Sequence, residues 1–213
     1  MASPIALAAG AAIAPKAGAR SAWRAALPAI ETWSAVLREV EASDARPLSI
    51  ALGRPEVRQH LPIGPSTSSG FARFIRWVRR ERLAGRYLCF AVVPRGRAAA
   101  AGLFQLWPIE PGCRTAEMGC ALDPTLWGTG TFLDCATAVV DFAFGPLGVR
   151  RLECRSAVTN ERGTAAMGKL GAVREGTLRD CFECPAGPVD HIMWSILAKE
   201  WRPDGARDRR RRA

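Results

Sequence analysis

The chain of 213 residues contains few histidines, no second close pair of cysteines and no long apolar run, and each shortage excludes a class of function. No apolar stretch reaches the ~20 residues that a membrane-spanning helix needs, so we expect no membrane insertion. His60 and His191 are the only histidines. Cys181 and Cys184 have the spacing of zinc ligands, but the sequence offers no second pair of ligands to complete a structural zinc site. We therefore expect no bound metal ion.

The seven cysteines are odd in number and lie scattered through apolar stretches. This pattern is typical of buried thiols in a reducing compartment and argues against a disulfide framework. Together with the alanine- and arginine-rich composition, it favours a cytoplasmic protein. The first segment, "MASPIALAAGAAIAPKAGAR", lacks the positively charged start of a secretory signal. A transit peptide stays open as an alternative, and we favour an Ala-rich disordered extension.

The net charge of +10 is concentrated at the two ends of the chain. Residues 1–30 contain three basic residues and no acid, and residues 202–213 contain six arginines against two aspartates. The sequence therefore predicts one domain over residues 31–201 between two tails, without a broadly basic face on the domain. The final "RDRRRRA" is either a solvated tail or the basis of a weak contact with RNA or the ribosome.

Hydrophobic periodicity and turn residues predict a mixed α/β (α+β) domain. A strand and a short helix capped by Ser43 and Asp44 are expected within 33–48, and mainly a loop over 53–70. Further strands are expected over 86–93, 99–107, 114–122 and 149–158, with a final hairpin of 172–182 and 189–198. Helices are expected over 71–83, over 130–144 and from Asn160 to Gly171.

Three of these segments show which side chains should be buried. In helix 71–83 one side comprises Phe71, Phe74, Ile75, Val78 and Arg82, with Arg73, Arg76, Arg79 and Arg80 on the outside. In helix 130–144 the apolar face comprises Phe132, Leu133, Ala136, Val139, Val140 and Ala143, with Asp134, Thr137 and Asp141 opposite. In strand 114–122 the alternation of side chains turns Glu117 away from the apolar row.

The stretch "LDPTLWGTGTFLD" places Gly128 and Gly130 directly before the second helix. Glycines at a helix N-terminus form either a packing turn or a cradle in which main-chain N–H groups bind an anion. No lysine followed by serine or threonine completes a Walker loop, and Leu133 occupies the third glycine position of a dinucleotide fingerprint.

Three stretches together resemble one family. These are "ALDPTLWGTGTF", "VVDFAFGPLGVRRLECRSAVTNERGTAAMGKLGAVREGTLRD" and "VDHIMWSILAKEW". They look like the GNAT acetyltransferase superfamily, and within it the RimJ/RimL-type protein N-acetyltransferases, in an order that covers residues 35–201. The resemblance implies a central, mostly antiparallel sheet of about seven strands flanked by about four helices. Within that sheet, strands 114–122 and 149–158 would be parallel and splayed apart.

The resemblance also implies acetyl-CoA as co-substrate, with its pyrophosphate on the glycine turn, so the cradle is preferred to the packing turn. The residues implied to bind it are Leu122, Trp127, Gly128, Thr129, Gly130, Thr131 and Phe132, with Asn160 on the pantetheine arm. The sequence departs from the family pattern at four places: Phe132 replaces a small residue, Leu133-Asp134 replaces Thr-Glu, Gly163 replaces a serine and Ala172 replaces a phenylalanine. The Phe132 ring either crowds the cradle or points into the core.

The chemistry implied is direct attack of a primary amine on the thioester in a ternary complex. The acceptor is a protein N-terminal α-amine or a small-molecule amine. Glu117 is our candidate general base, and its alternative role is an exposed strand carboxylate paired with an arginine. Thr164 is the candidate proton donor, because the only tyrosine, Tyr87, comes early in the sheet.

A second function stays open. Because of Phe132 and Gly163, the chain could be a GNAT-fold protein that binds CoA or a partner with little turnover. The family pattern is compatible with a monomer or a homodimer.

Overall fold

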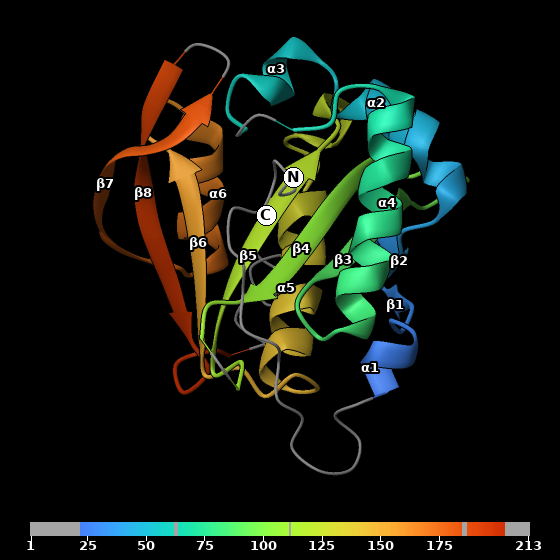
Figure 1. The fold of residues 1–213 in the computed structure, drawn as a ribbon. Helices are drawn as coiled ribbons and strands as arrows, with labels where there is room; N and C mark the ends of the chain where they lie inside the picture. Colours follow the sequence, from blue (N-terminus) through green and yellow to red (C-terminus); the bar gives the residue numbers. More distant parts are fainter. Residues whose placement is uncertain (1–21, 62–63, 111, 185–186, 203–213) are drawn as a thin grey trace.

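One mixed sheet organises the molecule in the computed structural model, which describes residues 22–61, 64–110, 112–184 and 187–202 (Figure 1). Within these residues the sheet has eight strands in the order β1-β2-β3-β4-β5-β6-β8-β7. The strands are β1 (Ile30–Glu31), β2 (Ala35–Glu39), β3 (Leu88–Pro94), β4 (Gly102–Pro108), β5 (Thr115–Leu122), β6 (Arg151–Ala157), β7 (Val173–Cys184) and β8 (Gly187–Leu197). The prediction of about seven strands missed only the two-residue β1.

Helices cover both faces of this sheet (Figure 1). They are α1 (Ala22–Ala25), α2 (Ala45–Ala51), α3 (Pro55–Arg58), α4 (Ser68–Leu83), α5 (Thr131–Phe144) and α6 (Glu161–Leu170), with short 3₁₀ turns η2 (Ala42–Asp44) and η3 (Pro124–Leu126). Helices α2 and α4 pack over one face in a core that includes Phe71 and Leu103. Helix α5 packs over the other face against Phe90 and Met118. No described helix is long and apolar enough to cross a membrane.

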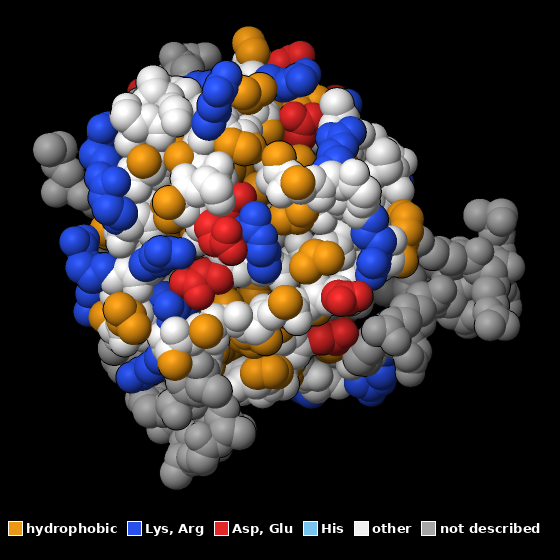
Figure 2. Space-filling model, turned by 90° about the vertical axis from the view of Figure 1, so that its right-hand side faces the viewer, with side chains coloured by type: hydrophobic (Ala, Val, Ile, Leu, Met, Phe, Trp, Pro, Cys, Tyr) orange, Lys and Arg blue, Asp and Glu red, His pale blue; other side chains and the backbone are white. Residues whose placement is uncertain are grey.

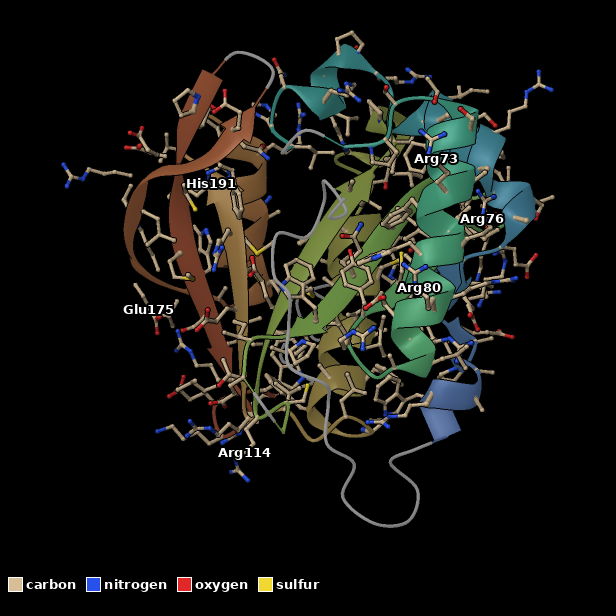
Figure 3. All side chains as sticks on the ribbon, in the orientation of Figure 1. Arg73, Arg76, Arg80, Arg114, Glu175 and His191 are labelled. Carbon is tan, nitrogen blue, oxygen red and sulfur yellow. The ribbon has the colours of Figure 1, made fainter. Side chains whose placement is uncertain are left out.

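Helix α4 confirms its predicted pattern. Its buried residues are Phe71, Phe74, Ile75, Val78 and Arg82, as expected from the sequence. The helix begins earlier than predicted, because the Thr67 hydroxyl accepts a hydrogen bond from the Gly70 N–H and caps it. The outer arginines, three of which are labelled in Figure 3, project from the helix. Acidic and basic side chains are interspersed on the face that Figure 2 shows.

Residues 53–70 are mainly loop, as predicted, although they also contain α3 and the start of α4. Two local predictions were wrong. Asp44 is the N-cap residue of α2 but does not cap it through its side chain. Its carboxylate instead accepts a hydrogen bond from the Glu41 N–H at 2.8 Å and binds Arg38 at 2.7 and 2.8 Å. Thr137 is buried rather than outward, and its hydroxyl donates to the Leu133 carbonyl one turn back at 2.7 Å.

Strands β5 and β6 form the only parallel pair of the described sheet, and the pair is short. Their register joins Thr115–Glu117 to Arg151–Glu153 and then stops, although both strands continue. Beyond Glu117 the two strands diverge, as the splayed pair predicted (Figure 1). The predicted N-terminal extension lies mostly outside the described residues, and so does the predicted arginine tail.

Candidate active site

The glycine turn leads into α5 through backbone conformations that favour glycine. Gly128 and Gly130 have φ values of 75° and 86°, and Gly130 is the N-cap residue of α5 without a side chain to accept a hydrogen bond. A Cβ atom at Gly128 would meet nothing within 4 Å. Because the first turn of a helix leaves main-chain N–H groups without internal acceptors, this open turn can bind an anion.

Side chains inside the turn hold it in shape. The Thr129 hydroxyl lies 2.8 Å from both the Leu126 carbonyl, to which it donates, and the Thr131 hydroxyl. Asp123 accepts a hydrogen bond from the Thr125 N–H at 2.8 Å. The predicted ligands Thr129 and Thr131 therefore use their hydroxyls within the turn, which leaves main-chain N–H groups as the anion donors.

A cleft of about 360 Å³ runs from this turn between α6 and the end of β5. Its walls include six of the eight predicted cofactor residues: Leu122, Trp127, Gly128, Gly130, Phe132 and Asn160. The fold therefore brings these six predicted residues together in space. Arg162 and Lys169 of α6 also line the cleft, and the Arg162 guanidinium lies 4.2 Å above the Trp127 ring. These cations were not predicted, and they suit a ligand with phosphate groups.

Two of the departures from the family pattern, Phe132 and Gly163, have local explanations. The Phe132 ring stacks on the buried Phe104 with centroids 6.1 Å apart, so it forms a half-buried wall of the cleft. Asn160 caps α6 by accepting a hydrogen bond from the Gly163 N–H at 2.9 Å. A Cβ atom at Gly163 would lie 2.6 Å from Asn160 Nδ2, so glycine makes room for this cap.

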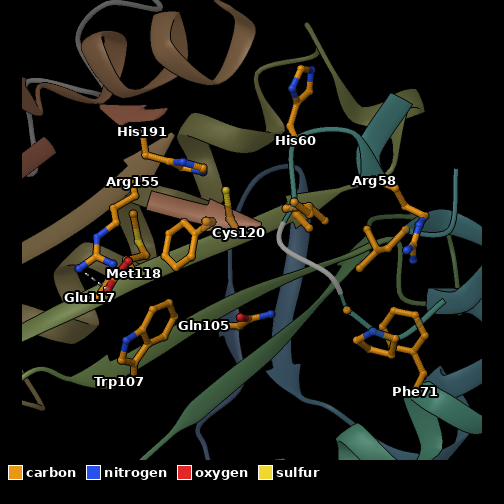
Figure 4. A pocket seen from close by; sticks show the side chains of 17 residues that line it. Arg58, His60, Phe71, Gln105, Trp107, Glu117, Met118, Cys120, Arg155 and His191 are labelled. Atoms are coloured by element: carbon orange, nitrogen blue, oxygen red, sulfur yellow. Dashed lines mark ion pairs between the residues drawn. The ribbon is translucent and has the colours of Figure 1, made fainter. Parts of the chain in front are cut away.

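A second, smaller cavity of about 110 Å³ lies on the α4 side of the sheet (Figure 4). Its chemically distinctive lining residues are Arg58, His60, Gln105, Glu117, Arg155 and His191, with aromatic walls from Phe71, Trp107 and Phe182. His60, Leu61, Cys120 and Ala121 line both this cavity and the cleft. The two spaces therefore meet at β5, where the strands have just diverged.

Glu117 projects into the smaller cavity from the last residue of β5 that pairs with β6. It is 6% exposed, which excludes the alternative of an exposed strand carboxylate, although it does pair with Arg155 at 3.5 Å. Burial raises the pKa of Glu117 to about 7; Glu153 adds to this, while Arg155 and a hydrogen bond from Trp107 oppose it. A carboxylate with such a pKa suits proton transfer near neutral pH.

Several lining residues could not be found from the sequence. Arg155 comes from β6, Phe182 from β7 and His191 from β8, so only the strand register brings them together. His191 is buried, and burial lowers its pKa below the usual range. Gln105 is held from beneath by the Tyr87 hydroxyl, which donates to its Oε1 at 2.6 Å. Tyr87 therefore does not line the cavity itself but supports Gln105, which does.

Thr164 lies elsewhere. Its hydroxyl is 3.4 Å from the Ser156 hydroxyl, which accepts a hydrogen bond from Trp194 Nε1. Thr164 is not among the residues that line either of the two spaces. Its role as proton donor therefore stays a prediction, without support from this geometry.

No group of three or more His, Cys, Asp or Glu side chains that could hold a metal ion occurs among the residues that the structure describes. Six cysteines are free thiols, and the Cys184 side chain is outside the described part. Of the six, four are buried.

Comparison with known sequences decides the family. The sequence model described as "Acetyltransferase (GNAT) domain" matches residues 35–173. The chain is a GNAT acetyltransferase. A relative from Bacillus licheniformis, described as an uncharacterized N-acetyltransferase, is 26% identical over 166 residues, which cover 78% of this chain and 93% of the relative. A second relative, YoaA of Bacillus subtilis, is also described as an uncharacterized N-acetyltransferase and is 23% identical over 80% of this chain and 97% of its own.

Solved structures confirm the GNAT fold. Mycobacterium smegmatis RimJ in complex with CoA-disulfide has a TM-score of 0.76 at 20% identity, covering 84% of this chain and 91% of that one. The ribosomal-protein-S5-alanine acetyltransferase of Vibrio fischeri has a TM-score of 0.73 at 19% identity, covering 83% of this chain and 100% of that one. The GNAT fold that the resemblance implied is thereby confirmed, and at these identities the likeness shows the fold alone.

Proposed function

We propose that this GNAT domain transfers an acetyl group from acetyl-CoA to a primary amine, either a protein N-terminal α-amine or a small-molecule amine. The observation that carries the proposal is the meeting of the two spaces at Cys120 and Ala121. One space begins at an open anion-binding turn, and the other contains a buried carboxylate. A long phosphate-bearing donor and a short amine acceptor would meet there.

The residues of the cleft fit the proposed co-substrate. Main-chain N–H groups between Gly128 and Phe132 would bind the pyrophosphate, and Arg162 and Lys169 would add positive charge. The bound thioester supplies the activated acetyl group, so the protein has to position the amine and move its protons. Glu117 would accept a proton from the amine, directly or through a water molecule.

The alternative of a CoA-binding protein with little turnover rested on Phe132 and Gly163. Phe132 stacks on Phe104 and leaves space over Gly128, and Gly163 accommodates the Asn160 cap. Neither residue therefore requires an inactive site, and no other observation favours this alternative.

Calorimetric titration of acetyl-CoA into wild type and a Gly130→Glu variant tests the donor site. We expect micromolar binding in wild type and its loss in the variant, because a carboxylate would occupy the anion site. Gly112→Glu is the matched control: Gly112 shares the φ of 86°, and a Cβ atom there would meet nothing within 4 Å, but it lies in the turn before β5, at the opposite end of that strand. Wild type that binds no acetyl-CoA would overturn the proposal.

The same preparations test catalysis. We expect Glu117→Gln to retain acetyl-CoA binding and to lose about 10²-fold or more in kcat with any acceptor that wild type acetylates. Peptides with free and blocked α-amines, and small primary amines, form the acceptor panel. Turnover that is unchanged in Glu117→Gln would remove Glu117 from the mechanism.

A further inference from the structure

The proposed reaction requires more than one proton acceptor at the amine. A protonated amine loses one proton before it can attack and a second as the amide forms. The departing thiolate takes back one proton, so one is released overall. Glu117 holds a single proton at a time, which leaves the second proton of the nitrogen to another group or to water. The following inference therefore rests on the proposed function.

His191 is a basic group on the wall of the same cavity (Figure 4). It projects from β8, while Glu117 and Arg155 project from β5 and β6 on the same side of the cavity. The His191 side chain is 3% exposed, and its ring meets the Phe182 ring edge to face with centroids 4.9 Å apart. The imidazole is therefore held in one orientation by packing.

Its hydrogen bond fixes which nitrogen is available. His191 Nδ1 lies 3.0 Å from the Val189 carbonyl oxygen, which can only accept a hydrogen bond. In the neutral ring Nδ1 therefore carries the proton, and Nε2 keeps its lone pair. Within the described residues the structure gives Nε2 no hydrogen-bond partner.

The neutral form of this ring is favoured chiefly by its burial. Burial lowers the pKa of His191, and Arg155 on β6 adds to that effect. The Val189 carbonyl and Asp190, its neighbour on β8, act in the opposite direction. The other titratable or charged groups that line this cavity are Arg58, His60, and Glu117 and Cys120 on β5, and Cys181 on β7 lies near Arg155 and Glu117.

We propose that His191, through Nε2, is the second proton acceptor of the acceptor cavity and works with Glu117. One proton of the ammonium group goes to Glu117, and the amine nitrogen forms its bond to the acetyl carbon. The second proton goes to His191 Nε2 as the carbon–sulfur bond breaks. One of the two protons then passes to the thiolate through solvent, and the other leaves to bulk water. Both side chains are thereby restored.

The presence of only two histidines makes a direct test practical. Full-length protein labelled with ¹⁵N-histidine gives two imidazole systems, and a His60→Gln variant assigns them. At pH 7.5 we expect His191 to show a protonated Nδ1 and an unprotonated Nε2. On acidification the titration midpoint of this ring should lie below pH 6.5. Asp190→Asn removes a nearby negative charge and should move that midpoint further down. A charged ring, or a proton on Nε2, at pH 7.5 would overturn the proposal without touching the proposed function.

The pH dependence of kcat/KM tests the catalytic step. When both groups must be unprotonated, a plot of log kcat/KM against pH approaches a slope of two on its acid side. We expect His191→Gln to reduce that slope to about one and to lower the rate about 10²-fold. The Asp190→Asn control should keep the steeper slope. A His191→Gln variant with the wild-type slope and rate would refute the role of His191. A wild type that acetylates no acceptor would refute the proposed function instead, and the imidazole measurement would still report on His191.

Discussion

Glu117 gives the sharpest prediction, because the pKa of its buried carboxyl is far above that of an exposed glutamate. In the unfolded chain this group ionises near 4.5, whereas the fold raises its pKa to about 7. Between these values the folded state retains a proton that the unfolded state has lost, so the free energy of unfolding falls as pH rises. One pH unit corresponds to about 1.4 kcal/mol, which gives a loss of about 3 kcal/mol across the interval.

Replacing Glu117 by glutamine removes this titration while keeping the size of the side chain. We expect urea unfolding to show that the variant gains about 2.5 kcal/mol more over wild type at pH 8 than at pH 5, because the rest of the change falls below pH 5. Since the side chain is almost entirely shielded from solvent, the effect should change little with salt.

Glu81→Gln is the control for this measurement. The pKa of Glu81 is lowered, chiefly by a hydrogen bond from Arg86, so this group is ionised at both pH values. The stability difference of that variant from wild type should therefore be the same at pH 5 and pH 8. If Glu117→Gln also gave a pH-independent difference, the carboxyl would not be destabilised by burial, and the argument for its role as base would fail.

Three further substitutions test the framework of the site. Gly163→Ser should cost about 1 kcal/mol in urea unfolding, because its Cβ displaces the Asn160 cap of α6; unchanged stability would show that the cap adjusts. Tyr87→Phe should lower thermal stability by about 1–2 kcal/mol, since Gln105 Oε1 loses its donor in a buried site, and a neutral result would mean that water replaces the hydroxyl. Arg82→Met should cost about 3 kcal/mol, because Glu39 loses its 2.9 Å partner and the carbonyl of Arg24 loses a donor; a loss below 1 kcal/mol would show that the ion pair is dispensable.

The parts of the fold that the sequence predicted well are those governed by local periodicity. The face of α4 could be read directly, because its apolar residues repeat every three or four positions and meet one core. The glycine turn could be predicted equally well, since the backbone conformation at Gly128 and Gly130 is one that glycine adopts readily.

The composition of the acceptor cavity could not be predicted in the same way. His191, Arg155 and Phe182 become neighbours of Glu117 only through the registers of β6, β7 and β8, which no local pattern specifies. The burial of Glu117 was missed for the same reason. Its strand alternation showed that it faces away from one core, but the second layer over that face comes from distant elements.

The short pairing of β5 with β6 has a consequence for aggregation. From Met118 to Leu122, β5 has a ladder partner on its β4 side only, so the centre of the sheet contains an interior strand edge. Exposed edges of this kind recruit strands from other molecules, and proteins usually protect them with charges or by covering them. Here the edge lies where β6 diverges from β5 (Figure 1), and Cys120, Ala121 and Leu122 line the cleft of about 360 Å³ that α6 closes on the other side. A cleft of that size admits a narrow ligand but not a second folded sheet.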